Sequence, residues 1–491
     1  MDFCSTRNRD LRVTSAQAIL QGLSEDGGLF TPVSLPSFSA QQIEDMAKMN
    51  YRQVAEIVLS AFLPDYTREE IAGFVEGAYG KQFDVPEVAP VRKFREGAYS
   101  LELWHGPTCA FKDFALQMLP RLLPAAAKKC GSDKTVAILV ATSGDTGKAA
   151  LAGFQDVPGV RICVFYPDGG VSAVQRAQMV TQEGENVTVS AIQGNFDNAQ
   201  TGVKNIFAAC RDGKLLEGKG FKLSSANSIN IGRLAPQIMY YFRSYRDLLD
   251  AGKITLGEEV NFSVPTGNFG DILAGWLAGA LGLPVGKLIC ASNANNVLTD
   301  FIRTGTYDKR RPLLKTTSPS MDILVSSNLE RLLYLLSGDT KLVAELMGKL
   351  NKEGSYTVPD SLLEKIQTEF TAYYCDDARA EEVMGRVYKD LGYLCDPHTA
   401  SGWAAAEDYV KETGDNRAMV VLSTASPYKF PVAVLTAIGG DTSGNEFEQM
   451  ERLSAMTNVP IPRNLSGLQG KEEKHTGVIP KDKMLEYVLS L

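Results

Sequence analysis

The sequence predicts an α/β protein built on parallel β-sheets, and three observations support this fold class. From about residue 134, an apolar β-rich segment, a glycine-containing loop and an amphipathic helix follow one another several times. The apolar segments are continuous rather than alternating, which is typical of strands covered by helices on both faces. A chain of 491 residues, 44% of them hydrophobic, is long enough for two or three domains with substantial cores.

The N-terminal part, residues 1–90, is predicted to be a mainly helical domain. Its apolar residues recur at helical spacing, and Ser39 and Thr67 are expected helix caps. A turn-rich segment at residues 22–32 and a proline-bounded linker at residues 86–90 interrupt this pattern.

The rest of the chain is predicted to form two α/β domains. The smaller covers residues 130–235, and the larger combines residues 91–129 with 236–491. Between about 299 and 395 the pattern is helical again, so we interpret that segment as an insertion into the larger domain. The last ~50 residues contain several prolines and glycines and are expected to be loop-rich surface. The expected strands are residues 135–141, 160–166, 187–192, 260–264 and 419–422.

Residues 105–113 (HGPTCAFKD) contain a candidate catalytic lysine, Lys112, between Phe111 and Asp113. An apolar-periodic run follows, and Asp113 is expected to cap the helix that it forms. An amine held at a helix start and partly desolvated by an aromatic ring could lose its proton near neutral pH and attack a carbonyl carbon. The segment alone fits a solvated surface lysine equally well, and that is the commoner case.

Two strand-to-helix loops are candidate anion sites. The first is the loop Gly267, Asn268, Phe269 and Gly270, with Asp271 opening the next helix, and the second is residues 143–147 (SGDTG). In such sheets ligands bind at the carboxyl ends of strands, where free backbone N–H groups and the helix dipole favour an anion. The alternative is that the glycines only allow tight turns. Residues 194–196 (GNF) lack the second glycine and are interpreted as such a turn.

Other motifs and functional classes fit the sequence poorly. No GxGxxG, GxSxG or HExxH occurs, and Gly147-Lys148 resembles the end of a phosphate-binding P-loop but is followed by Ala149. A net charge of −8 argues against a general nucleic-acid binder. Eight cysteines without a CxxC pair and only three histidines make a metal site improbable. With no signal-peptide layout and no uncharged run of ~20 residues, a cytoplasmic protein with no membrane partner is expected.

What remains is one candidate imine-forming lysine and two anion loops. Those groups suit an aldehyde cofactor that carries its own phosphate, together with a substrate that carries a carboxylate. Pyridoxal 5'-phosphate meets the first requirement.

The motifs of the chain resemble those of the threonine synthase family, pyridoxal-phosphate enzymes with the tryptophan-synthase β-like fold (fold type II). The resemblance runs from residue 5 to about 470, and its N-terminal part is similar to the bacterial and fungal branch. It is carried by residues 105–113, 143–147, 227–230 (NSIN) with Arg233, 265–271 (PTGNFGD) and 423–425 (STA).

The resemblance implies conversion of O-phospho-L-homoserine and water to L-threonine and phosphate. Lys112 would hold the cofactor covalently and then shuttle protons at the substrate's Cα and Cβ. Thr424 would offer a neutral hydroxyl to the pyridine nitrogen. The cofactor phosphate would be held by Gly267, Asn268, Phe269, Gly270 and Asp271. The substrate carboxylate would lie against Ser143, Asp145 and Thr146, and its phosphate against Asn227, Ser228 and Arg233.

Some positions depart from the family pattern. Asn8 stands where the family commonly has glycine, and Ile231-Gly232 replace a frequent Trp-Ala before the arginine. Lys148 stands where serine is frequent. Lys148 could tune substrate choice, or it could be a solvated lysine at a helix start.

The same fold also supports a phospho-lyase or dehydratase, which would release a keto acid, and a catalytically silent binding protein. The expected partner is the small-molecule substrate, with no nucleic acid, and the sequence leaves monomer and homodimer open.

Overall fold

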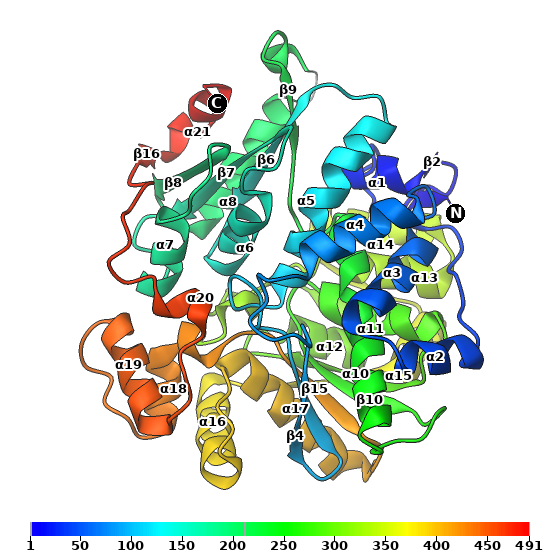
Figure 1. Ribbon diagram of the computed structural model, residues 1–491. Coiled ribbons are helices and arrows are strands. Elements are labelled where there is room, and N and C mark those ends of the chain that lie inside the picture. The colour runs from blue at the N-terminus through cyan, green and yellow to red at the C-terminus, as the bar shows by residue number, and fades with distance from the viewer. Residues whose placement is uncertain (1, 211–212, 491) are drawn as a thin grey trace.

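Two sheets form the framework of the computed structural model, which describes residues 2–210 and 213–490 (Figure 1). The larger sheet has the strand order β14-β11-β10-β15-β5-β4, and only the β4–β5 pair is antiparallel. The smaller sheet has the order β16-β8-β7-β6-β9 and is parallel throughout. The predicted fold class, with parallel sheets in two α/β units, is therefore confirmed.

All five strands expected from the sequence are present. The larger sheet consists of β4 (Val91–Arg95), β5 (Ala98–Glu102), β10 (Val260–Pro265), β11 (Val285–Ser292), β14 (Phe370–Tyr374) and β15 (Met419–Ser423). The smaller sheet consists of β6 (Thr135–Ala141), β7 (Val160–Pro167), β8 (Val187–Gln193), β9 (Phe221–Ser224) and β16 (Val478–Pro480). Continuous apolar sequence identified the central strands because both of their faces are buried.

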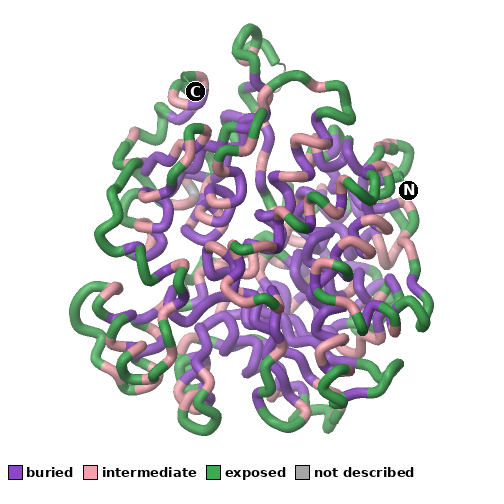
Figure 2. The backbone as a smooth tube through the Cα atoms, in the orientation of Figure 1, coloured by how far each residue is buried: buried purple, intermediate pink, exposed green. Residues whose placement is uncertain are grey.

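Helices pack around both sheets (Figure 1), and the chain in the interior is mostly buried (Figure 2). The helix α5 contacts α1, α4, α6 and α9, so it lies where these parts meet. The helices beside the two sheets are α5 (Lys112–Lys129), α6 (Asp145–Phe154), α7 (Ala173–Val180), α8 (Phe196–Ala209), α9 (Ile231–Leu234), α10 (Met239–Asp250), α11 (Gly270–Ala280), α17 (Pro397–Thr413) and α18 (Pro431–Ala437).

The N-terminal region is mainly helical, with a small antiparallel sheet that the sequence did not suggest. Ser39 and Thr67 each cap a helix and form a reciprocal capping box, as predicted. The helices are α1 (Ser15–Gln21), α2 (Ala40–Ala47), α3 (Tyr51–Phe62) and α4 (Arg68–Ala78), and the strands are β1 (Phe3–Ser5), β2 (Arg12–Val13) and β3 (Phe30–Pro32).

The segment 299–395 is not purely helical, and this part of the prediction is wrong. Its strand β14 pairs with β11 at the edge of the larger sheet, and β12 (Thr306–Asp308) pairs with β13 (Ser355–Thr357). These strands are short and carry Thr and Tyr, so no apolar run marked them. The helices in and beside the segment are α12 (Val297–Thr304), α13 (Leu329–Ser337), α14 (Thr340–Glu353), α15 (Asp360–Glu369) and α16 (Asp377–Leu391).

The C-terminal part is also more regular than expected. It contains α19 (Glu446–Thr457), α20 (Arg463–Ser466) and α21 (Met484–Leu489), so it is not simply a series of surface loops. The strand β16 pairs with β8, which means that the segment 236–491, assigned to the larger domain, ends in the smaller sheet. The other predicted domain boundaries stay predictions.

Candidate active site

Three adjacent parallel strands bring the predicted cofactor residues together. The strands β10, β15 and β5 lie side by side, so their carboxyl ends meet at one edge of the larger sheet. β5 leads to the loop before Lys112, β15 leads to Thr424, and β10 leads to the loop that begins at Gly267. Topology thus places residues from three distant parts of the chain at one edge of the sheet.

The lysine loop is fixed against the loop that carries Thr424. The Phe111 N–H donates to the Thr424 carbonyl at 2.8 Å, and the Ser426 N–H donates to the Cys109 carbonyl at 3.0 Å. Thr424 itself is 4% exposed. These backbone bonds fix the position of the chain immediately before Lys112.

The prediction that Asp113 caps the helix is wrong. The helix α5 begins at Lys112, and Asp113 lies in its first turn. The Asp113 carboxylate turns back and accepts hydrogen bonds from the N–H and the hydroxyl of Thr108, at 2.9 and 2.7 Å. Burial raises the pKa of Asp113 to about 6, partly offset by these two bonds. Asp113 therefore orders the loop in front of the lysine.

The Lys112 amine is desolvated, as the sequence suggested. Its Nζ lies 5.5 Å from the centroid of the Phe111 ring and donates to the Ser320 hydroxyl at 3.2 Å. Burial lowers the pKa of Lys112 to about 8, and the nearby Asp145 carboxylate partly opposes this shift. A substantial fraction of this amine is consequently neutral near physiological pH, as a nucleophile or proton acceptor requires.

The loop 267–270 has the shape of an anion site. A Cβ atom on Gly267 would lie 2.8 Å from the Ser320 carbonyl oxygen, so only glycine fits there. Phe269 has φ +63°, which turns the chain into α11 at Gly270. The loop is held in place because the Asn328 N–H donates to the Asn268 carbonyl at 3.0 Å. The N-terminus of an 11-residue helix at this point favours a phosphate.

Asp271 is a buried carboxyl group at the start of the same helix. The Tyr240 and Tyr241 hydroxyls donate to its Oδ1 at 2.5 and 3.1 Å, whereas its Oδ2 has no partner within the described structure. Burial raises the pKa of Asp271 to about 7, and the two tyrosines partly offset the shift.

Asp145, predicted to face the substrate carboxylate, is held by a lysine that the sequence analysis missed. Its Oδ1 lies 2.7 Å from the Nζ of Lys429 and accepts a hydrogen bond from Gln175 at 2.9 Å. Burial alone would raise the pKa of Asp145, but Lys429 and then Lys112 keep it well below its usual range. Lys429 is fully buried. One signal for it was available, because it is the only charged residue between Arg417 and Asp441.

Asp145 also connects the two sheets. It opens α6 after β6 of the smaller sheet, whereas Lys429 follows β15 of the larger one. The Ser320 hydroxyl lies 3.5 Å from Asp145 and also contacts Lys112. Ser143 and Thr146, from the same loop as Asp145, are half-buried. Ser320 is a further residue at the site that no local motif indicated.

The predicted phosphate-binding residues follow β9, the neighbour of β6 in the smaller sheet. Asn227 is exposed and Ser228 is half-buried, whereas Arg233 is buried. The Arg233 guanidinium donates to the Ala226 carbonyl, its Nε has no partner, and no described carboxylate lies within 4 Å of it. Burial lowers the pKa of Arg233 to about 10. A buried cation without a counter-ion is suited to binding an anion.

Comparison with known proteins agrees with this arrangement. Residues 2–79 match the threonine synthase N-terminus, residues 95–424 match the pyridoxal-phosphate dependent enzymes, and residues 399–487 match the threonine synthase C-terminal family. The threonine synthase of Pseudomonas aeruginosa is 41% identical over 466 residues, which cover 93% of this chain and 96% of that protein.

The chain belongs to the threonine synthase family.

Solved structures agree on the fold. The PLP-bound threonine synthase from Brucella melitensis is 36% identical, with a TM-score of 0.89 over 100% of this chain and 99% of that one. The threonine synthase from yeast gives the same TM-score at 31% identity over 99% and 98%. Human threonine synthase-like 1 is 39% identical over 434 residues, 86% of this chain, and the match spans only 58% of that longer protein.

The site of this family member fits its family's cofactor, pyridoxal phosphate. Lys112 has the lowered pKa that bonding to an aldehyde requires, and Gly267 leaves room that a Cβ would fill. The roles of the individual residues stay predictions.

Lys148, for which a solvated position was one alternative, is half-buried, and its Nζ donates to Gln182 at 2.5 Å. Within the described residues, no helix has both the length and the apolar character needed to span a bilayer.

Proposed function

We propose that this chain is a threonine synthase that uses pyridoxal phosphate to convert O-phospho-L-homoserine and water to L-threonine and phosphate. The proposal rests above all on the meeting of Lys112, Thr424 and the 267–271 loop at the ends of three adjacent strands. The loop after β9 of the smaller sheet leads to Arg233, a buried cation with no described counter-ion that acts electrostatically on Lys112.

Lys112 would act as the proton carrier. Bound pyridoxal phosphate would supply a ring that withdraws electrons from the substrate. An amine with a pKa of about 8 can accept a proton from Cα and return one at Cβ near neutral pH. Thr424 would offer its hydroxyl to the ring nitrogen, and the amides from Gly267 to Asp271 would hold the cofactor phosphate at the start of α11.

The smaller sheet would hold both ends of the substrate. Arg233, with Asn227 and Ser228 on the loop before it, would bind the substrate phosphate. The hydroxyls of Ser143 and Thr146 would bind the substrate carboxylate. Since the Asp145 carboxylate is already paired with Lys429, we propose that Asp145 contributes by holding that cation beside the substrate.

A phospho-lyase is the second candidate function. The buried Arg233, which has no described counter-ion, is compatible with this reaction as well. Both reactions lose phosphate, so Arg233 does not distinguish them. We place either reaction in the cytoplasm, with the small-molecule substrate as partner and without nucleic acid.

Product analysis tests the proposal. Purified protein loaded with pyridoxal phosphate is given O-phospho-L-homoserine, and phosphate, threonine and 2-oxobutyrate are measured together. We expect phosphate and threonine in equal amounts. Phosphate with 2-oxobutyrate as the main product would establish the lyase, and no phosphate release would reject both functions.

A further inference from the structure

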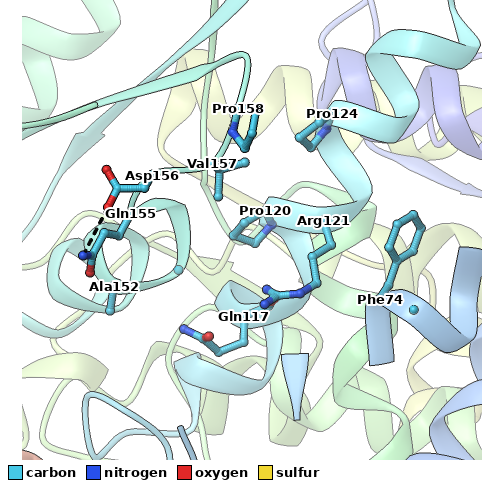
Figure 3. Close-up of a pocket in the computed structure, with 12 residues that line it drawn as sticks. Phe74, Gln117, Pro120, Arg121, Pro124, Ala152, Gln155, Asp156, Val157 and Pro158 are labelled. Carbon is cyan, nitrogen blue, oxygen red and sulfur yellow. Dashed lines mark hydrogen bonds between the residues drawn. The ribbon is translucent and has the colours of Figure 1, made fainter. Parts of the chain in front are cut away.

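A hollow of about 580 Å³ lies away from the cluster around Lys112. Figure 3 shows it between α4, α5, α6 and the loop that follows α6. Half of the residues that line it have apolar side chains: Phe74, Pro120, Pro124, Ala152, Val157 and Pro158. The helices α5 and α6 that border the hollow begin at Lys112 and Asp145 in the candidate site.

Two polar side chains of α5 line the hollow: Gln117 has an unpartnered amide nitrogen, and Arg121 is hydrogen-bonded but has no described counter-ion. Gln117 is only 6% exposed, yet its amide Nε2 has no hydrogen-bond partner among the described residues. Arg121, one helical turn later, donates to the Gln117 and Gly77 carbonyls, each at 2.5 Å. No carboxylate of the described chain lies within 4 Å of its guanidinium, and burial lowers the pKa of Arg121.

The polar groups lie on one face because α5 has helical spacing at this point, and Figure 3 shows Gln117 and Arg121 beside each other. A buried amide without an acceptor and a cation without a counter-ion both favour an anionic group. The opposite rim carries the Asp156 carboxylate, which would repel a doubly charged anion such as phosphate.

We propose that this hollow is a binding site for a small aliphatic carboxylate. The carboxylate would accept hydrogen bonds from the Gln117 amide and the Arg121 guanidinium, and the hydrocarbon body would lie against the prolines and Val157. An unmodified carboxylic acid and an aliphatic α-amino acid share this chemistry. The amino acid would additionally place its ammonium group toward Asp156.

Titration calorimetry of the cofactor-loaded protein tests the site with three probes of one hydrocarbon size. These are 3-methylbutanoate, L-valine and isobutylamine. 3-Methylbutanoate has no amine and cannot react with the cofactor aldehyde. The part of its binding that the variant Gln117→Glu removes reports on the hollow rather than on the substrate carboxylate site. We expect saturable binding of 3-methylbutanoate in the hollow, whereas the heat from isobutylamine, which can react with the cofactor aldehyde, should be the same in the parent protein and in Gln117→Glu. For the binding that Gln117→Glu removes, a tighter association of L-valine than of 3-methylbutanoate would identify an amino acid as the natural ligand, and an equal or weaker one would identify the simple acid.

Three variants locate the binding. Gln117→Glu keeps the side-chain size and puts a carboxylate beside Arg121, so it should occupy the site and abolish binding. Arg121→Met should weaken binding roughly 10- to 100-fold, the usual loss for a hydrogen bond to a charged group. Gln41→Leu, at an exposed position on α2, is the matched control and should bind normally.

Circular dichroism confirms that each variant is folded. No binding of 3-methylbutanoate to the parent protein, or unchanged binding in both folded Gln117→Glu and Arg121→Met, would overturn the proposal. Because binding is measured as heat without turnover, failure here leaves the proposed activity untouched, and the reverse also holds.

Discussion

Two buried cations at the candidate site have opposite surroundings. Lys429 lies 2.7 Å from the Asp145 carboxylate and also donates to the Thr108 carbonyl at 3.0 Å. Arg233 has one carbonyl partner and an unpartnered Nε. One charge is neutralised inside the fold, whereas the other has no described counter-ion.

This difference separates a structural cation from a binding cation. A buried charge is costly unless it is paired, so Lys429 and Asp145 stabilise the junction of the two sheets only as a pair. Arg233 bears the cost of burial without that compensation, which a bound phosphate would supply. The uncompensated cost of burying the Arg233 charge is therefore the property that suits this residue to bind an anionic ligand.

The largest effect is expected at Lys112, which is near enough to both cations that each lowers its pKa. Lys112→Ala should lower the rate of phosphate release by roughly 10²–10⁴ or more, because the proton carrier is lost. The fold should persist, since the amine makes one weak hydrogen bond to Ser320. A coupled phosphate assay with O-phospho-L-homoserine measures the rate.

The control is Lys128→Ala, an exposed lysine at the other end of α5. It should leave the rate unchanged. If Lys112→Ala retains near-normal turnover, the assigned role of Lys112 is wrong.

The next effect concerns stability and contrasts the two cations directly. Lys429→Met leaves the Asp145 charge buried and unpaired, so it should lower the free energy of unfolding by about 3–5 kcal/mol. Arg233→Met removes an uncompensated charge and should cost far less. Urea unfolding measures the free energy of unfolding of both variants, with Lys411→Met at an exposed position as the control. Equal losses for Lys429→Met and Arg233→Met would show that the two cations do not differ in their contribution to stability.

The third effect concerns ligand binding, for which we expect Arg233 to matter more than Lys429. Arg233→Ala should weaken binding of O-phospho-L-homoserine by roughly 2–5 kcal/mol, because a desolvated charge pair loses one partner. Binding of unphosphorylated L-homoserine should change much less. Equilibrium titration with both ligands checks this, and equal losses for the two would speak against a phosphate clamp.

The same contrast shows what the sequence could predict. Lys112 and the 267–271 loop could be proposed as site residues because each stands in a local sequence motif where a loop enters a helix. Lys429 was missed because its partner Asp145 follows a strand of the other sheet, and only the fold brings them together. The edge strand β14 was missed for a related reason, since its polar and aromatic sequence pairs with β11 only through tertiary contacts.

The smallest effect, measured per pH unit, should be a change in the pH dependence of stability at Asp271. Its pKa is raised to about 7 in the fold, mainly by burial, above the ordinary value of about 3.9. The protonated form is thus favoured in the native state. This stabilisation is full below about pH 4 and is lost as the pH rises toward 7, with a slope of at most about 1.4 kcal/mol per pH unit.

Asp271→Asn keeps a neutral side chain that can still accept the Tyr240 and Tyr241 hydrogen bonds. The difference in unfolding free energy between the parent protein and this variant should therefore change between pH 4 and 7 and be constant above pH 8. Urea unfolding across that range, without added cofactor, measures the difference. A difference independent of pH would show that Asp271 is ionised throughout, and the unpartnered Oδ2 would then need a cation rather than a proton beside it.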